Sequence, residues 1–313
     1  MNKIFAYASS CLLAVASSGA VLAAEPEQCQ KPRIGVVGWT DVVATTAVTK
    51  VLLEHLGYQP TENVASQQII FAGMKKKQVD FFLGYWNPLM TETITPFVKA
   101  NDVKLLQVNL DGAMATLAVP SYASEGGLKT FADIAKFKDK LKGKIYGIES
   151  GTGANTKIQK MIDSNQFGLG DFKLIESSES GMMAAVKRAV KRNEWIVFFG
   201  WAPHPMNIQV DMNYLTGSDD ALGANDGAAT VETVVRPGYV EQCPNVGQLL
   251  SNMTFDVKQE SAMMQPIMDR QKPEDVAEQW LKDHPEDMQK WLAGVSTFDG
   301  KDALATLQAK LAN

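Results

Sequence analysis

The chain has 313 residues, of which 45% are hydrophobic and 21% charged, and its formal net charge is −5. This mild acidic balance argues against nucleic acid as a partner, and the length fits one large or two medium domains. The three histidines lack the spacing of metal ligands, and no nucleophile elbow, Ser-His-Asp order or Walker-type loop is evident. We therefore expect a protein that is not an enzyme and that holds no metal or cofactor.

The first 23 residues have the features of a secretory signal peptide. Lys3 precedes an apolar run from Ile4 to Val21, and small residues then favour cleavage after Ala23. A retained membrane anchor is the alternative, although serines and a glycine interrupt the run. No later stretch approaches the ~18 consecutive apolar residues of a membrane span. We expect residues 1–23 to be removed and the mature chain to lie in the periplasm.

Two cysteines, Cys29 and Cys243, remain after that cleavage. In an oxidising compartment an even pair of cysteines predicts a disulfide, which would join the mature N-terminus to a late segment. Two free buried thiols are the alternative.

Strand-like and helix-like segments alternate along the chain, which predicts an α/β fold with a largely parallel sheet. Strands are predicted at residues 33–37, 79–83, 103–108, 115–120, 144–148, 173–176, 196–199 and 228–235. Helices are predicted at 42–56, 66–77, 157–164 and 181–192, in part over 89–101, and almost throughout from Asn245 on.

The alternation stops near residue 120 and restarts at residue 144, which suggests a second lobe inserted into the first. We predict lobe 1 at residues 24–118 and 225–313 and lobe 2 at 119–224. Such lobes form a hinged, bilobal architecture, and the cleft between them is a common ligand site.

A strand-Gly-Trp order occurs three times, at Trp39, Trp86 and Trp201. In open α/β sheets ligands bind at the carboxyl ends of strands, so the three rings could converge on one pocket. A cage of aromatic faces suits a quaternary ammonium ion. The alternative is packing in the core, where large aromatic residues usually lie, but packing alone does not require the repeated order.

Two polar residues accompany these rings. Asp41 could place a negative charge near the cation or accept a hydrogen bond from a ligand hydroxyl, and it could also be the N-cap of the helix that follows. Asn155 lies in a glycine-rich turn, Gly151 to Thr156, that opens a helix. Free N–H groups at such a turn suit anionic or polar ligand groups, and Asn155 could orient them; a plain tight turn is the alternative.

The chain resembles the substrate-binding proteins of ABC importers for choline, glycine betaine and related compounds, over nearly the whole mature chain. The segments that carry the resemblance are 38–41, 84–88, 116–120, 151–156 and 200–203. It implies the type II-like, bilobal periplasmic-binding-protein fold with two α/β lobes, a membrane permease as partner and a monomeric binding protein. The residue roles that it implies are cage walls at Trp39, Trp86 and Trp201, a carboxylate for the choline hydroxyl at Asp41, and a second polar contact at Asn155. Cys29 and Cys243 also resemble a disulfide of the choline-binding branch.

One position departs from that branch, which often has a tyrosine where this chain has Ala115. Either Tyr85, Tyr122 or Tyr214 supplies a ring from elsewhere, or the cage is open on that side and admits a bulkier ligand such as carnitine. The carboxylate of a betaine would need N–H groups, which the Gly151 to Thr156 turn could offer. Choline is favoured, because Asp41 would repel a carboxylate beside it.

Three rival functions belong to other classes. An enzyme acting on a methylammonium compound would need a catalytic motif that the sequence lacks. A chemosensory or osmotic-stress binding protein would present the same ligands to a receptor, and the sequence does not separate it from a transport protein because both use the same closed lobes. A structural envelope protein would bind no ligand saturably.

Overall fold

The computed structural model describes residues 24–311, and the predicted signal peptide lies outside the described residues. Within residues 24–311 no helix combines the length and apolar character needed to cross a membrane. The strands are β1 Arg33–Val36, β2 Thr61–Val64, β3 Phe81–Asn87, β4 Lys104–Pro120, β5 Lys144–Tyr146, β6 Lys173–Ile175, β7 Phe198–Ala202, β8 Met212–Tyr214 and β9 Ala228–Val235.

The helices fall into three groups along the chain. Those before β4 are α1 Thr40–His55, α2 Gln67–Lys75 and α3 Thr91–Lys99. Those between β4 and β9 are α4 Ser121–Glu125, α5 Phe131–Ile134, α6 Gly153–Asp163, α7 Glu179–Lys191, α8 Met206–Gln209 and α9 Ala224–Gly227. Those after β9 are α10 Tyr239–Gln242, α11 Pro244–Asn252, α12 Val257–Met268, α13 Pro273–Asp283, α14 Pro285–Trp291 and α15 Ala303–Leu311.

All the strands belong to one sheet in the order β2-β1-β3-β9-β4-β7-β5-β6, with β8 paired to β4. β1 is parallel to β2 and β3, and β5 is parallel to β6 and β7. β9 is antiparallel to β3 and β4, and β4 is antiparallel to β7. The predicted parallel arrangement therefore holds within each half, and two antiparallel strands join the halves.

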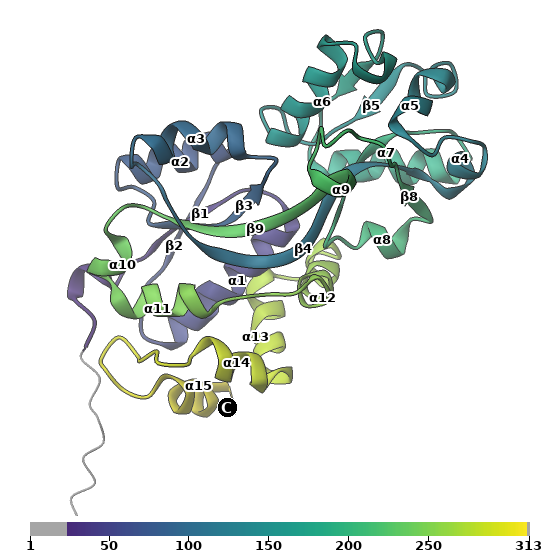
Figure 1. Ribbon diagram of the computed structural model, residues 1–313. Helices are drawn as coiled ribbons and strands as arrows, with labels where there is room; N and C mark the ends of the chain where they lie inside the picture. Colours follow the sequence, from purple (N-terminus) through teal and green to yellow (C-terminus); the bar gives the residue numbers. More distant parts are fainter. Residues whose placement is uncertain (1–23, 312–313) are drawn as a thin grey trace, which may run out of the picture.

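β4 and β9 run between two groups of elements, as Figure 1 shows. Lobe 1 contains β1 to β3, α1 to α3 and the helices from α10 onward, and lobe 2 contains β5 to β8 with α4 to α9. This is the predicted bilobal fold. The predicted boundary at 118/119 falls inside β4, and the one at 224/225 falls at the start of α9; both boundaries stay predictions.

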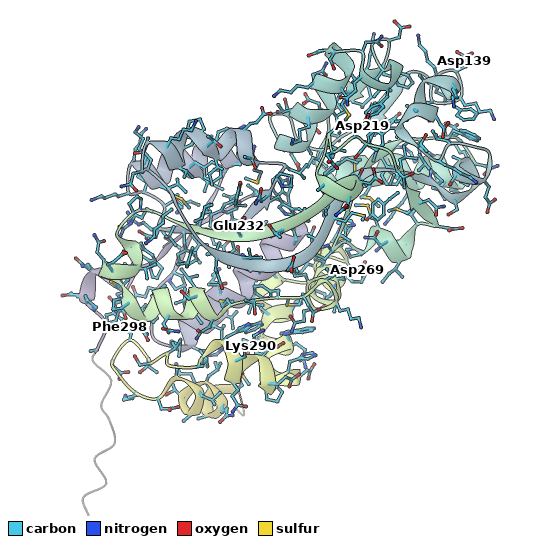
Figure 2. All side chains as sticks on the ribbon, viewed as in Figure 1. Asp139, Asp219, Glu232, Asp269, Lys290 and Phe298 are labelled. Carbon is cyan, nitrogen blue, oxygen red and sulfur yellow. A yellow bond between two sulfur atoms is a disulfide. The ribbon has the colours of Figure 1, made fainter. Side chains whose placement is uncertain are left out.

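Register shifts in β4 lie at Leu105/Gln107, Val108/Leu110 and Leu110/Ala113, where it pairs with β9. Bulges of this kind bend a strand and increase its twist, which lets one strand serve both lobes. Glu232 of β9, labelled in Figure 2, accepts a hydrogen bond from the Asn87 amide at 2.9 Å, on the crossing next to β3.

Helix α1 lies between the sheet and the C-terminal helices of lobe 1 and contacts α12 and α13. Most of its side chains are buried, because it is covered on both sides. A Cβ at Gly84 would lie 2.4 Å from Val42 Cγ2, so glycine is needed where β3 meets the first turn of α1. This close approach brings Trp86 next to the residues that begin α1.

Several predicted boundaries were wrong for an identifiable reason. The two predicted strands at 103–108 and 115–120 are one strand, β4. The predicted strands 79–83 and 196–199 extend to Asn87 and Ala202, so Trp86 and Trp201 lie within strands and not beyond them. Trp86 pairs with Val231 and Trp201 with Ala115 on antiparallel neighbours, and that pairing is invisible in a local pattern.

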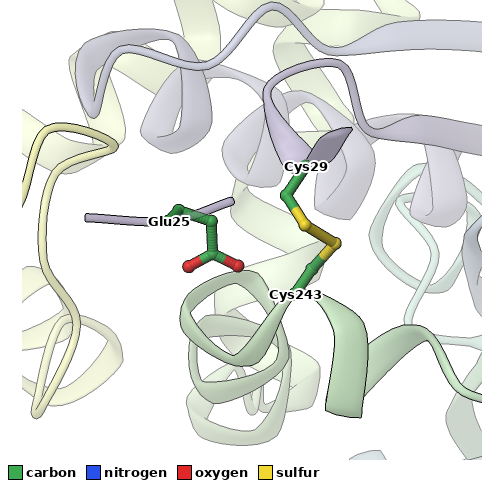
Figure 3. Close-up of side chains that lie close together, drawn as sticks. All are labelled: Glu25, Cys29 and Cys243. Atoms are coloured by element: carbon green, nitrogen blue, oxygen red, sulfur yellow. A yellow bond between two sulfur atoms is a disulfide. The ribbon is translucent and has the colours of Figure 1, made fainter. Parts of the chain in front are cut away.

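The predicted disulfide between Cys29 and Cys243 is confirmed, with their Cα atoms 5.6 Å apart (Figure 3). Beside it the Glu25 carboxylate accepts a hydrogen bond from the Asn245 N–H at 3.0 Å. These contacts fix the N-terminal segment to the start of α11. Glu25 and the two sulfur atoms lie within ligand distance of one another, but sulfurs joined in a disulfide offer no thiolate to a metal.

Candidate ligand-binding site

A small, largely apolar cavity lies between the two lobes. Twelve residues line it: Trp39, Asp41, Trp86, Leu89, Met90, Ala115, Ile148, Thr152, Gly153, Ala154, Phe199 and Trp201. Four of the five predicted ligand-binding residues are brought together there, and Asn155 is not.

Trp39 and Trp86 both use their indole N–H groups within the protein. Trp39 lies between β1 and α1 and donates to Glu149 Oε2 at 3.1 Å. Trp86 lies on β3 and donates to Asp41 Oδ2 at 2.9 Å. Since the polar edge of each indole is already bonded, what the two rings offer the cavity is apolar and aromatic surface.

Trp201 and Phe199 lie on β7 two residues apart, so they point to the same face of the sheet. Their ring centroids are 5.5 Å apart with an interplanar angle of 29°. Phe199 is a lining residue that sequence reasoning missed. Its spacing of two from Trp201 in a predicted strand was the signal that could have found it.

Phe199 also matters for Ala115, the position where the choline-binding branch often has a tyrosine. Ala115 lies on β4, pairs with Trp201 of β7 and lines the cavity. The three tyrosines considered from the sequence are not among the lining residues, and their hydroxyls bond elsewhere: Tyr85 to Thr91, Tyr122 to the Glu194 carbonyl and Tyr214 to Asn207. The fourth aromatic ring of the cavity is therefore Phe199.

Asp41 is the second residue of α1 and is only 2% exposed. The N-cap position belongs to Trp39, so the interpretation of Asp41 as the N-cap was wrong. Its Oδ2 accepts from Trp86, while its Oδ1 has no hydrogen-bond partner within the part of the chain that the structure describes. Burial raises the pKa of Asp41 to about 7, and the negative charge of Glu179 adds to the rise.

Asn155 lies in the first turn of α6, buried behind the cavity wall. Its side-chain N–H groups donate to the carbonyls of Ile148 and Glu149 and to Glu176 Oε1, at 2.8, 3.1 and 3.1 Å. Its Oδ1 accepts from the Ile148 N–H at 3.0 Å. The amide is thus engaged in holding the β5–α6 loop, and the structure gives it no direct place at the cavity.

The residues of the glycine-rich turn that do line the cavity are Thr152, Gly153 and Ala154. Thr152 is the N-cap of α6 and its hydroxyl accepts from the Asn155 N–H at 3.3 Å. A Cβ at Gly153 would lie 2.0 Å from the Leu89 carbonyl oxygen in lobe 1. Only glycine lets the N-terminus of α6 approach the opposite lobe this closely.

The cavity combines aromatic faces with one acidic group. Its lining, taken from residues 24–311, includes no lysine, arginine or histidine. A buried carboxylate with one unpaired oxygen is costly unless a cation or a donor reaches it. Aromatic faces attract a cation through their quadrupole, so the site is suited to a small organic cation.

Two α/β lobes joined by paired strands, with an aromatic-walled cavity between them, define a bilobal solute-binding protein. Residues 32–283 match the family of the substrate binding domain of the ABC-type glycine betaine transport system, and the chain belongs to this family. Its members are solute-binding proteins of ABC transporters and not enzymes.

Solved structures and curated proteins give individual relatives. The chain is 46% identical to an ABC-transporter choline binding protein in complex with choline, with a TM-score of 0.89 over 92% of this chain and 100% of that one. It is 27% identical to lactococcal OpuAC in its closed-liganded conformation with glycine betaine, with a TM-score of 0.77 over 84% and 99% of the two chains. The glycine betaine/carnitine transport binding protein GbuC of Listeria monocytogenes is 31% identical over 53% of this chain and 54% of its own length.

Proposed function

We propose that this protein captures a quaternary ammonium compound, with choline as the preferred ligand, and delivers it to an ABC importer. The observation that carries the proposal is the buried Asp41 carboxylate, with one unpaired oxygen, in a cavity walled by Trp39, Trp86, Trp201 and Phe199.

The chemistry of the ligand class matches these walls. A quaternary ammonium group has no N–H donor, so it cannot form a conventional salt bridge with hydrogen bonds. Aromatic faces attract its charge and bury its methyl groups, with about 2 kcal/mol or more for each desolvated contact. Several rings together support binding near micromolar, about −8 kcal/mol, after the costs of association.

Asp41 favours choline within this class. Its unpaired Oδ1 suits a ligand hydroxyl as donor, and its negative charge complements the ammonium group. A ligand carboxylate placed beside it would be repelled. The 46% identity to a choline binding protein supports the same ligand. Ala115 leaves a small side chain in one wall, so carnitine is the main competitor to be tested.

The partner and location follow from the family and the N-terminal sequence. We infer a permease of an ABC importer as the partner, a periplasmic location after cleavage near Ala23, and a monomeric binding protein. The buried disulfide fits an oxidising compartment. Deletion of the gene should abolish high-affinity uptake; intact uptake would favour a sensor that presents the ligand to a receptor.

The test is calorimetric titration of the mature, ligand-stripped protein with choline, carnitine and glycine betaine. We expect tight choline binding, and we expect Trp39→Ala, Trp86→Ala and Trp201→Ala each to weaken it by about 1–2 kcal/mol. Trp195→Ala is the matched control, because Trp195 packs against Phe137 in lobe 2 and does not line the cavity. Asp41→Asn should weaken choline more than glycine betaine.

Two results would overturn parts of the proposal. If the protein prefers carnitine or glycine betaine, choline is not its main ligand. That result would indicate a subsite for the ligand carboxylate, with the N-terminus of α6 as the first candidate. Absence of binding to all three compounds would refute the cage and assign the tryptophans to packing.

A further inference from the structure

Two carboxylates of lobe 2 meet the corner of lobe 1 that carries Trp39. Glu149 follows β5, and Glu179 is the first residue of α7. Glu149 Oε2 accepts from the Trp39 indole N–H at 3.1 Å. Glu179 accepts from the Thr40 N–H at 2.9 Å and from the Thr40 hydroxyl at 2.6 Å. Three hydrogen bonds to charged groups therefore cross from one lobe to the other at a wall of the cavity.

Helix α1 has no side-chain cap of its own. Its N-cap residue, Trp39, makes no side-chain capping bond, and Thr40 is the first helical residue. The first N–H groups of a helix need partners from outside it, and its N-terminus carries a partial positive charge. Glu179 supplies both the acceptor and the negative charge, but it comes from the opposite lobe.

The N-terminus of α7 faces this same point. The Glu179 N–H donates to Glu149 Oε1 at 3.1 Å, and Ser178 caps the helix by accepting from the Gly181 N–H at 3.0 Å. Two helix N-termini facing each other would repel. The two carboxylates lie between them and compensate both partial charges, so the arrangement is favourable only while the lobes are closed.

His204 holds Glu179 in place. Its Nδ1 accepts from the Met206 N–H at 2.8 Å, so its Nε2 carries the proton and donates to Glu179 Oε1 at 3.0 Å. The Glu179 carboxylate thus only accepts hydrogen bonds, and its donors are Thr40 and His204. Glutamine at this position would turn an amide N–H₂ toward a donor with no change in shape.

These contacts differ from the other bonds across the cleft. Gln68 donates to the Gly151 carbonyl at 2.6 Å and Gln209 to Gln265 at 2.8 Å, both at exposed edges of the lobes. Lys160 of α6 also forms an ion pair with Glu92 of α3, but both side chains are more than half exposed. Glu179 is only 5% exposed. Charge-assisted bonds shielded from water are stronger than exposed bonds, and exposed ion pairs contribute little, so the bonds to the buried Glu179 are the strongest polar contact between the lobes.

We propose that Glu149 and Glu179 are positioning residues that latch the two lobes together, cap α1 from across the cleft and fix the Trp39 indole over the ligand. The latch acts on the closed form and does not touch the ligand, so it sets how long the ligand stays bound. The proposal rests on the proposed function for its ligand. It predicts that the latch slows dissociation of the ligand and has little effect on its association.

The test is stopped-flow kinetics with choline on the wild type and on Glu179→Gln, Glu149→Gln, Thr40→Val and Thr40→Ser. We expect Glu179→Gln to raise koff by about tenfold or more and to change kon by less than about threefold. Thr40→Val removes a donor without altering charge and should also raise koff, whereas Thr40→Ser keeps the hydroxyl and should restore the wild-type rate. A double Thr40→Val, Glu179→Gln variant should be no worse than Glu179→Gln alone.

The control is Glu125→Gln, which removes one exposed charge from α4 of lobe 2. If Glu125→Gln matches Glu179→Gln, bulk charge and not the latch sets the rate, and the proposal fails. An unchanged koff in both Glu179→Gln and Thr40→Val would also refute it, while the proposed function would stand.

A second measurement does not depend on the ligand. The distribution of distances between spin labels on the two lobes, in ligand-free protein, should shift toward open forms in Glu179→Gln and not in Glu125→Gln. If the wild type fails to bind choline, the proposed function is wrong, and this distance measurement still decides whether the latch exists.

Discussion

At the scale of single residues, Asp41 is the focus of the site's electrostatics. It is buried, it keeps one oxygen unpaired, and it shares its surroundings with two further carboxylates. Glu179 raises its pKa from lobe 2, and Glu260 of α12 is itself buried beside it. Burial raises the pKa of Glu260 well above its usual value, and Asp41 and Asp256 add to this rise. Acidic groups thus cluster where a cationic ligand would lie, and without a cation their burial favours the protonated forms.

This cluster predicts that closure of the ligand-free protein depends on pH. In the closed structure the pKa of Asp41 is about 7, against 3.8 for an unperturbed group, which an open cleft exposed to water approaches. Between these two values the closed form binds more protons than the open form, so closure should be favoured as pH falls through 7 and should level off near pH 4. We expect shorter distances between labels on the two lobes at pH 5.5 than at pH 8.

Asp41→Asn is the matched variant for this prediction, because an amide does not titrate. It should remove most of the pH dependence between pH 5.5 and 8. An equal dependence in Asp41→Asn would assign the effect to the neighbouring Glu260 instead.

At the scale of elements, the β5–α6 loop shows how a polar residue near a site can act without touching the ligand. Asn155 bonds both the N–H and the carbonyl of Ile148 and the carbonyl of Glu149. Those bonds fix the loop that presents Thr152 and Gly153 to the cavity and that carries Glu149 to Trp39. The Asn155 amide therefore stabilises the β5–α6 loop and does not contact the ligand directly.

Asn155→Ala should reduce the free energy of unfolding by about 1–3 kcal/mol, because it leaves the buried N–H of Ile148 without a partner. Choline affinity of the folded protein should change less than stability does. Urea unfolding and calorimetric titration measure the two effects, with Gln159→Ala on the exposed side of α6 as control. A large loss of affinity with normal stability would restore Asn155 as a direct ligand contact.

At the scale of the whole molecule, the chain crosses between lobes through β4 and β9, and its N-terminal segment is tied to α11 at the base of lobe 1. The disulfide lies wholly in lobe 1, while the cavity and the latch lie between the lobes. Stability of lobe 1 and motion of the lobes are therefore served by separate parts of the structure.

A double Cys29→Ser, Cys243→Ser variant should lose stability without losing the ligand. Removing a disulfide that closes so long a loop is expected to cost about 2–5 kcal/mol of the free energy of unfolding. Denaturant unfolding checks this value, and titration with choline checks that affinity stays within about threefold of the wild type, since the cavity is not altered. A matching loss of affinity would show that the bond also controls the lobes.

The sequence by itself determined the α/β alternation, the bilobal fold, the family and the pairing of Cys29 with Cys243, all of which the structure and the relatives confirm. It also selected Trp39, Asp41, Trp86 and Trp201, which the fold brings to one cavity. These features could be predicted because apolar periodicity, capping signals and repeated motifs are local properties of the chain.

Tertiary structure alone decided the features that depend on partners distant in sequence. Antiparallel pairing with β9 and β4 placed Trp86 and Trp201 inside strands, and the packing of β7 made Phe199 the fourth ring. Closure of the lobes set Glu149 and Glu179 against Trp39 and Thr40. A hydrogen bond between residues more than a hundred positions apart leaves no periodic trace, so only the folded chain reveals it.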